Sequence, residues 1–447
     1  MEQDLTTGSV FKRIVYFSLP YLLSYFLQTL YGMADLFITG QFYGVDTITA
    51  VSNGSQIMHM MTVIIVGLAM GTTVTIGHSV GAKCMEQAEK IIGNTITLFM
   101  GIAVAFTVIL VVLVKPIVVL IATPQEAVAG TSIYLLICFI GIPFITAYNI
   151  ISSIFRGLGD SKSPMYFIGI ACVMNIALDY LFMGAFHMGA AGAALGTVCA
   201  QTFSVLVTLW VIRRRKTGIS LKKSDFKIER AVIGQVLKIG IPVALQDGFI
   251  QVAFMIITVI ANSRGVSDAA AVGVVEKVIS ALFIVPSSML ATVSALSAQN
   301  LGAGKEKRAT DTLRYATVIT TIYGMIVAVL IQFIAENVVG IFTSDTTVVT
   351  MGSAYIRSYI LDCIFAGIHF SFSGYFAACG KSYIGFLHNI ISITFVRVPG
   401  SYLASKYFTD TLYPMGLAAP AGSLVSVAIC VTAFILLKRK SRVAQTA

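Results

Sequence analysis

The sequence predicts an all-α integral membrane protein with twelve transmembrane helices, arranged as two pseudo-symmetric six-helix lobes with a central cavity. Three observations lead to this fold class: an apolar composition, a series of long hydrophobic runs and an internal repeat. Of the 447 residues, 57% are hydrophobic and only 11% are charged, whereas soluble domains average about 45–50% apolar and about 25% charged residues. The mean hydropathy of +0.88 agrees with a membrane protein.

The hydrophobic runs give the expected helices in order. A membrane-spanning helix needs about 20 predominantly apolar residues. Runs of this kind lie at residues 14–39, 47–78, 90–114, 131–155, 163–186, 189–212, 232–262, 269–298, 309–334, 350–376, 382–405 and 412–437. The one long polar stretch, RRRKTGISLKKSDFKIER, separates the sixth run from the seventh. We therefore expect an amino-terminal lobe at 1–212, a basic cytoplasmic linker at 213–230 and a carboxy-terminal lobe at 231–447.

The basic residues predict how the chain is oriented in the membrane. Most of the 30 lysines and arginines lie on the two termini and on the even-numbered connections. The odd-numbered connections carry only Lys115, Arg264 and Lys406. Because basic residues gather on the cytoplasmic side, both termini are expected in the cytoplasm. The net charge of +10 then needs no nucleic-acid partner to explain it.

The two halves of the sequence resemble each other at an offset of 221 residues, which carries Gly81 onto Gly302 and Gly159 onto Gly380. After a slip of one residue, Pro20 also aligns with Pro242. Each half contains six expected helices, and six is an even number, so both halves enter the membrane from the same side. Such halves are related by an axis along the membrane normal, an arrangement that suits alternating access to a central site.

Five acidic residues fall inside the expected helices: Asp35, Asp179, Asp247, Glu276 and Asp362. A charged group at the middle of a membrane costs about 2.5–3.5 kcal/mol on insertion scales, so each is a candidate functional residue. At the offset of the repeat, none of these positions carries an acid in the other half. The acids therefore belong to one lobe each, which favours a functional role over an architectural one.

Four polar residues of the amino-terminal lobe are expected at similar depths. Asn175 and Asp179 are four residues apart and therefore share one face of a helix. With Gly40, Phe186 and Gly189 taken as outer helix ends, Asp35 lies roughly 7 Å deep, Asp179 roughly 10 Å and Thr197 roughly 12 Å. We therefore expect Asp35, Asp179 and Thr197 in one layer of the outer leaflet, with Asn175 one turn deeper on the face of Asp179.

Two carboxylates, an amide and a hydroxyl can bind a small cation. They offer the oxygen ligands that a hard ion such as Na⁺ requires, or a proton that two neighbouring acids share. Two aspartates close together in a medium of low dielectric constant do not both remain bare anions, so this group is a candidate coupling site. The competing interpretation is that these residues are polar contacts between packed helices.

The substrate cavity has its own candidates: Gln28, Asp247, Gln251, Glu276 and Asp362. Asp247 and Gln251 share a helix face through their four-residue spacing. An acidic cavity with aromatic and methionine side chains suits organic cations. The alternative is that these acids form structural pairs with Lys238, Arg357 or Arg397.

Three segments resemble the MATE (multidrug and toxic compound extrusion) transporters, in particular their DinF-like bacterial branch. They are MADLFITGQFYGVDTITAV at 33–51, IFRGLGDSKSPMY at 154–166 and HMGAAGAALGTVCAQ at 187–201, and the resemblance covers essentially the whole chain. It implies a V-shaped pair of six-helix bundles that exports cationic amphiphiles across a bacterial cytoplasmic membrane.

The resemblance also implies functional residues. By motif position, the family's H⁺- or Na⁺-binding residues fall on Asp35, Asn175, Asp179 and Thr197. Other branches carry a Glu in the seventh helix; only Asp247 or Gln251 lies near that position here, so a second cation site in that lobe stays open. Pro20 interrupts the hydrogen bonding of the first helix. We expect it either to act as a hinge that responds to the bound cation or to form an ordinary kink.

The sequence thus favours a secondary active antiporter that exports organic cations and is driven by H⁺ or Na⁺ entry. We expect no organic cofactor, no enzymatic activity, and a monomer whose partners are the lipid bilayer and small organic cations. The first rival is a lipid-linked oligosaccharide flippase, which would need a basic cavity. The second rival is an intramembrane enzyme, whose required motifs are missing from this sequence.

Overall fold

The computed structural model describes residues 4–214 and 220–446, with side chains up to Arg439. Arg215 and Lys216 of the expected linker, and the side chains of Lys440 and Arg442 near the carboxy terminus, therefore lie outside the described residues. Within the described ranges every regular element is helical, which confirms the all-α prediction. The chain divides into two compact units, each described here by itself.

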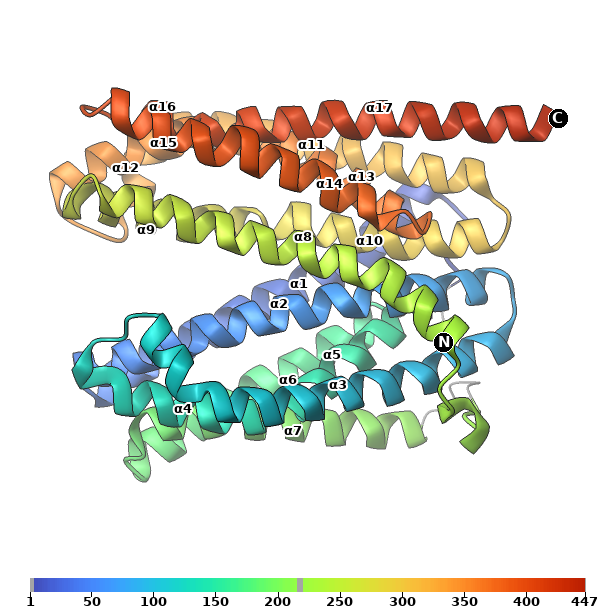
Figure 1. Cartoon of the computed structure of the whole chain (residues 1–447), viewed down its shortest axis with the longest axis horizontal. Helices are drawn as coiled ribbons and strands as arrows, with labels where there is room; N and C mark the ends of the chain where they lie inside the picture. Colours follow the sequence, from blue (N-terminus) through green and yellow to red (C-terminus); the bar gives the residue numbers. More distant parts are fainter. Residues whose placement is uncertain (1–3, 215–219, 447) are drawn as a thin grey trace. The chain divides into compact units, whose positions relative to one another are not determined.

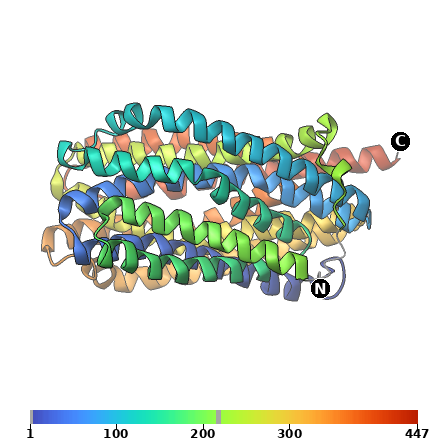
Figure 2. The ribbon, with the colours of Figure 1, turned by 90° about the horizontal axis from the view of Figure 1, so that it is seen from below.

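The first unit consists mainly of Val15–Gly240. Its helices run along a common direction, and in Figure 2 α6 and α7 lie side by side. The elements of the first half of the chain are α1 (Val10–Phe42), α2 (Val45–Gly81), α3 (Met85–Leu120), η1 (Gln125–Ala127), α4 (Val128–Ile140), α5 (Ile142–Gly157), α6 (Lys162–Asp179), η2 (Tyr180–Ala185), α7 (Gly189–Arg214) and η3 (Lys223–Phe226).

The second unit consists mainly of Ile241–Leu301 and Lys305–Ala447. Figure 1 shows its helices in yellow to red, again running along a common direction. The elements of the second half of the chain are α8 (Arg230–Asn262), α9 (Val266–Leu282), α10 (Ile284–Gly302), α11 (Glu306–Gly340), α12 (Thr346–Tyr359), α13 (Asp362–Ala378), α14 (Ser382–Ser392), η4 (Ile393–Arg397), α15 (Val398–Tyr407), α16 (Tyr413–Gly416) and α17 (Ala418–Thr446).

Most of the expected spans are apolar helices of sufficient length. In the described part of the chain, eight helices are long and apolar enough to cross a membrane, and two bent helix pairs raise this number to ten. The two remaining expected spans coincide with α1 and with the run from α14 to α15, which are helical but fall outside that set. Both contain polar residues in their middle turns, such as Gln28 and Asn389.

Two spans that the sequence predicts as single helices are bent. The pair formed by η1–α4 and α5 bends by 52°, and the pair formed by α12 and α13 bends by 43°. The first bend lies at Gly141 and the second just before Asp362, positions that the offset of 221 residues aligns. In the first pair Pro143 lacks the N–H that would continue the hydrogen bonding of α4. The sequence-based run count did not detect either bend.

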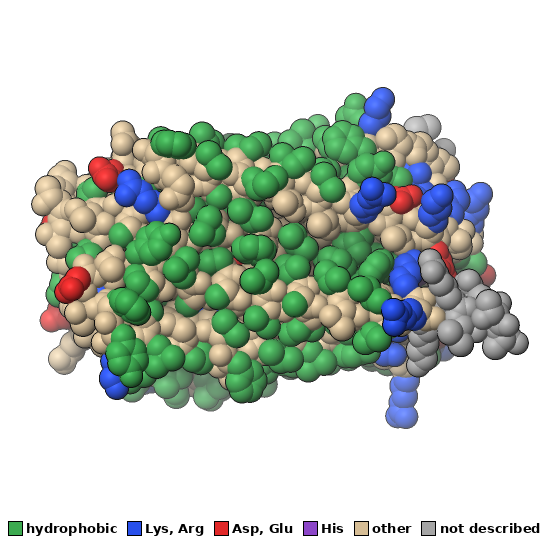
Figure 3. Space-filling model, turned by 90° about the horizontal axis from the view of Figure 1, so that it is seen from above, with side chains coloured by type: hydrophobic (Ala, Val, Ile, Leu, Met, Phe, Trp, Pro, Cys, Tyr) green, Lys and Arg blue, Asp and Glu red, His purple; other side chains and the backbone are tan. Residues whose placement is uncertain are grey.

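Close helix packing buries the interior of each unit. In the first unit, α2 and α4 approach so closely that a Cβ atom on Gly54 would lie 2.2 Å from the Tyr134 ring. The outer surfaces are apolar, as lipid contact requires: α11 exposes Val318, Ile322, Ile326 and Phe333. Figure 3 shows hydrophobic side chains covering the middle of one face, with Lys and Arg side chains mostly toward the ends.

Candidate cation-binding site

The four residues predicted to bind a cation come together inside the first unit. α1 carries Asp35, α6 carries Asn175 and Asp179, and α7 carries Thr197. Asp35 is 2% exposed, Asn175 and Asp179 are 0% exposed and Thr197 is 8% exposed. The similar depths expected from helix rise therefore correspond to one buried polar cluster.

The cluster contains one hydrogen bond between side chains. Thr197 Oγ1 donates to Asp35 Oδ2 at 3.3 Å. The side chains of Asn175 and Asp179 face the Asp35 carboxyl group closely enough to interact with it. Tyr31, one turn before Asp35 on α1, also lies within electrostatic range of this group.

Most polar atoms of the cluster have no hydrogen-bond partner in the described part of the chain. They are Asp35 Oδ1, both side-chain atoms of Asn175 and both carboxylate oxygens of Asp179. Buried polar groups in proteins nearly always have partners, so a group of unpaired atoms in one place points to a missing ligand. Four of these five atoms are oxygens, which can accept a proton or coordinate a hard cation.

A glycine on α7 makes room for the Asp179 carboxylate. A Cβ atom on Gly196 would lie 2.1 Å from Asp179 Oδ1 and 3.6 Å from Asn175 Nδ2. These distances show that α6 and α7 are in direct contact at the site. The sequence predicted Gly192 and Gly196 only as a helix-packing face, whereas the structure places Gly196 against the Asp179 carboxylate.

A π-helix begins directly after Asp179. The segment η2 covers Tyr180–Ala185, and such wide turns often occur at functional sites. Tyr43, the residue after α1, is bonded to η2, because the Tyr43 hydroxyl donates to the Met183 carbonyl oxygen at 3.0 Å. The Gly189 N–H in turn donates to the Tyr43 hydroxyl oxygen at 2.9 Å. Nothing in the hydrophobic pattern indicated this irregular segment.

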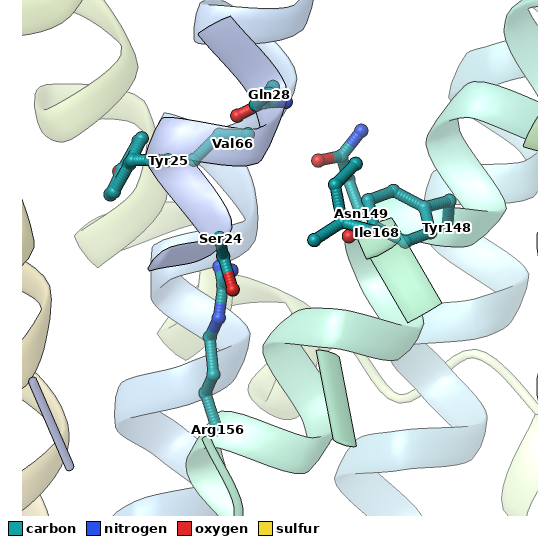
Figure 4. A pocket seen from close by; sticks show the side chains of 8 residues that line it. All are labelled: Ser24, Tyr25, Gln28, Val66, Tyr148, Asn149, Arg156 and Ile168. Atoms are coloured by element: carbon teal, nitrogen blue, oxygen red, sulfur yellow. The ribbon is translucent and has the colours of Figure 1, made fainter. Parts of the chain in front are cut away.

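The substrate-cavity candidates are divided between the two units. Asp247 and Gln251 lie half-buried on α8 and share a face, as their spacing predicted. Gln28 on α1 lines a pocket in the first unit (Figure 4). Glu276 on α9 and Asp362 at the start of α13 both lie near Arg397. That these residues line one cavity stays a prediction.

Arg397 is at the centre of a buried polar network in the second unit. Its guanidinium group donates to the Tyr359 hydroxyl and lies 5.0 Å from the centroid of the Phe254 ring. It interacts with Glu276 and Asp362 electrostatically, although neither forms a direct ion pair with it in the described part of the chain. For these two acids Arg397 is therefore an electrostatic neighbour, and not an ion-pair partner among the described residues.

Arg357 has a different partner from the one considered in the sequence. It pairs with Glu336 at 3.3 Å near the surface.

Pro20 lies inside α1, which continues through it to Phe42. One turn later, Ser24 Oγ donates to the Pro20 carbonyl oxygen at 2.8 Å, a type of side-chain bond that often bends helices.

Sequence reasoning missed Tyr31 and Arg156 as polar residues of the first unit. Tyr31 is four residues from Asp35, so helical periodicity could have added it to the cation cluster. Arg156 was placed in a cytoplasmic connection, because it follows an apolar run and belongs to a basic stretch. It is in fact part of α5, and it lines the same pocket as Gln28.

The two-unit helical fold and the buried cluster of carboxyl and amide groups are typical of a polytopic membrane transport protein. The sequence model of the MatE family matches residues 20–181 and again residues 242–403. The chain belongs to the MATE family, a family of transporters and not of enzymes. The two matched segments begin at Pro20 and Pro242, the residues that the internal repeat aligns.

Similar proteins support this assignment, and the similarity extends over most or all of the chain. The chain is 30% identical to the probable multidrug resistance protein YpnP of Bacillus subtilis, over 93% of each chain. It is 23% identical to the multidrug export protein MepA of Staphylococcus aureus, over 83% of this chain and 82% of MepA. Its fold matches an outward-facing multidrug resistance MATE family transporter with a TM-score of 0.91 at 20% identity, over 100% of this chain and 99% of that one.

Proposed function

We propose that this protein is a secondary active antiporter that exports organic cations and drugs across a bacterial cytoplasmic membrane. H⁺ or Na⁺ entering down its gradient would bind at Asp35, Asn175, Asp179 and Thr197 and drive export by alternating access. We further propose that the protein works as a monomer with both termini in the cytoplasm.

One observation carries this proposal: the unpaired oxygen atoms of Asp35, Asn175 and Asp179 lie together in a fully buried cluster. Two carboxylates in a region of low dielectric constant repel each other strongly unless a cation binds between them. Binding and release of that cation therefore change the energy of the site by a large amount. A change of this kind is what coupling to a second transport step requires.

The substrate class rests on two supports. The relatives YpnP and MepA carry names that refer to multidrug resistance and multidrug export. In the second unit, Asp247 on α8 is half-buried. An acidic group among apolar helices is suited to an organic cation. These features favour drug export over the transport of an anionic lipid-linked oligosaccharide.

Replacing the carboxylates tests the site assignment. We expect Asp35→Asn and Asp179→Asn each to abolish ethidium transport in everted membrane vesicles, because an amide neither takes up a proton nor balances the charge of Na⁺. Asp46→Asn is the matched control, since Asp46 is exposed at the start of α2 in the same unit. Near wild-type transport by both site variants, at normal protein levels, would disprove the assignment.

A further inference from the structure

The second part of the connection between α7 and α8 has a defined structure. Residues 220–229 contain the short helix η3 and belong to the first unit. In Figure 2 this segment is the short green coil at the margin of the unit, beside the beginning of α3. The segment therefore keeps its side chains at a fixed place next to one membrane-spanning helix.

Two polar side chains of α3 hold the backbone of this segment. The buried Asn94 donates from Nδ2 to the Asp225 carbonyl oxygen at 3.0 Å, and its Oδ1 accepts from the Glu229 N–H at 2.7 Å. Three residues further along α3, Thr97 Oγ1 donates to the Phe226 carbonyl oxygen at 3.0 Å. Because these bonds use backbone atoms of the segment, its side chains stay available for other contacts.

The segment also packs closely against α3 and turns one acid inward. A Cβ atom on Gly93 would lie 2.3 Å from the Asp225 carbonyl oxygen. The Asp225 side chain is buried, and its Oδ2 accepts from the Lys222 N–H at 2.7 Å. Glu229 is therefore the one exposed acid of residues 220–229, and the charge at the surface of the segment is mostly positive.

The point of attachment lies at the expected edge of the hydrocarbon core. On α3, the twenty residues 95–114 between Asn94 and Lys115 carry no charge. At 1.5 Å per residue they span about 30 Å, which is the thickness of the hydrocarbon core of a bilayer. Only 11% of the apolar part of α3 is buried inside the protein, so lipid surrounds most of this helix. Asn94, and η3 with it, therefore lies where hydrocarbon meets the headgroups.

The exposed side chains of the segment are of two kinds. Three are apolar and three are lysines, and we call these six side chains the linker surface: Leu221, Phe226, Ile228, Lys222, Lys223 and Lys227. Ile228 is 61% exposed. Among the described residues, no ion pair includes any of the three lysines. Apolar and basic side chains in one short segment are typical of structures that lie in the membrane interface, where lysines reach the lipid phosphates.

We propose that the linker surface binds the headgroups of anionic phospholipids. Its lysines complement the negative charge of the phosphates, and its apolar side chains enter the boundary below them. A soluble acidic partner or a nucleic acid would need the lysines but not the apolar side chains at the level of the lipid. The partner is therefore the bilayer itself, and the basic linker selects a class of lipid in addition to orienting the chain.

The test places a fluorescent reporter in the linker surface. Trp210 is the one tryptophan of the chain, so Trp210→Phe combined with Phe226→Trp leaves one tryptophan at the site. The full chain is incorporated into nanodiscs of mixed phosphatidylcholine and phosphatidylglycerol, with bromine atoms on the acyl chains of one lipid or the other. Bromine quenches tryptophan only at short range. We expect an apparent affinity about fivefold or more higher for phosphatidylglycerol, because each lysine near the surface favours anionic lipid.

Removal of charge then assigns this preference to the lysines. Changing Lys222, Lys223 and Lys227 together to Gln should make the affinities for the two lipids nearly equal, and high salt should have the same effect by screening the charges. The Trp210→Phe, Val108→Trp protein is the control for the reporter. Val108 is exposed in the middle of the uncharged stretch of α3, far from any headgroup, so quenching there should show no preference.

A second control separates the linker surface from the overall charge of the protein. Changing Lys12, Lys307 and Arg314 together to Gln removes the same charge from exposed positions of α1 and α11. This protein should keep the wild-type preference for phosphatidylglycerol at position 226. Loss of the preference to the same degree as in the variant with the three linker substitutions would show that net charge, and not this surface, is responsible.

Three further outcomes would overturn the inference. The first is equal quenching by the two brominated lipids at position 226. The second is a preference that survives the three linker substitutions in a folded protein. The third is the absence of quenching by either lipid, which would show that the segment faces water and that its lysines serve a soluble partner or none. No ion gradient is used, so failure of the antiport proposal would leave this test unaffected.

Discussion

Gly196 on α7 lies directly against the Asp179 carboxylate, so the proposed cation site depends on the absence of a side chain at position 196 as well as on its acids. A Cβ atom there would lie 2.1 Å from Asp179 Oδ1, a distance at which the carboxylate has to move. This contact explains a feature of the sequence that composition alone assigns to helix packing.

Gly196→Ala should therefore impair transport although it adds only one methyl group. The displaced Asp179 would no longer face Asp35 and Asn175 in the same way, and we expect ethidium export to fall about tenfold or more, the effect of losing one contact to a charged group. Gly101→Ala on α3 is the control, because a Cβ atom there meets nothing within 4 Å. Equal export by the two variants would show that the Gly196 contact has no functional importance.

Thr197→Val removes the one side-chain hydrogen bond to Asp35 and keeps the shape of the residue. A hydrogen bond to a charged group contributes about 1.5–3 kcal/mol, and this bond is long at 3.3 Å. We therefore expect the concentration of the coupling ion at half-maximal transport to change by about tenfold. The measurement is export rate against ion concentration in proteoliposomes.

Thr202→Val provides the comparison on the same helix, since the Thr202 hydroxyl donates to the carbonyl oxygen of Val198 within α7. This variant should retain the wild-type ion dependence. If Thr197→Val retained it as well, Thr197 would not belong to the site.

At the level of single helices, α1 connects several of these features. It carries Pro20, Gln28 and Asp35, and so joins the expected hinge, the pocket that Gln28 lines and the cation site. Gln28, Tyr31 and Asp35 follow one another at spacings of three and four residues and therefore lie along one face of the helix. A change in the bend of α1 would move this polar face relative to α5 and α6.

The hinge hypothesis concerns Pro20. If its missing N–H allows α1 to bend when a cation binds, Pro20→Ala should straighten the helix and slow export without abolishing ion binding. Export rate and the number of ions moved per substrate are both measured in proteoliposomes. Normal values of both would show that Pro20 forms an ordinary kink.

Several elements show where sequence reasoning succeeded and where it ended. Asp35, Asn175, Asp179 and Thr197 could be grouped because the rise per residue of a helix gives the depth of each residue to within about one turn. The bend at Gly141 and the π-helix η2 could not be predicted in this way, since neither interrupts a hydrophobic run. Arg156 was predicted in a connection, whereas it lies in α5, for a related reason. The sequence pattern of a basic residue at the end of an apolar run is the same whether its side chain faces water or a pocket.

At the scale of the whole molecule, both halves of the chain share one plan but differ in their buried charges. The family model matches each half once, and the bends before Ile142 and Asp362 occupy aligned positions. The first unit contains two buried acids near each other, whereas the second places Glu276 and Asp362 near Arg397. Because Arg397 already places a positive charge near the two acids of the second unit, the first unit is the stronger candidate for cation coupling.

The central claim is that a cation bound at Asp35 and Asp179 drives export. The most direct measurement uses purified protein in liposomes, with a Na⁺ gradient and a pH gradient imposed separately while ethidium transport is recorded. We predict that one of the two gradients drives transport by the wild type and that neither drives transport by Asp35→Asn or Asp179→Asn. Equal gradient-driven transport by the wild type and both variants would contradict the account.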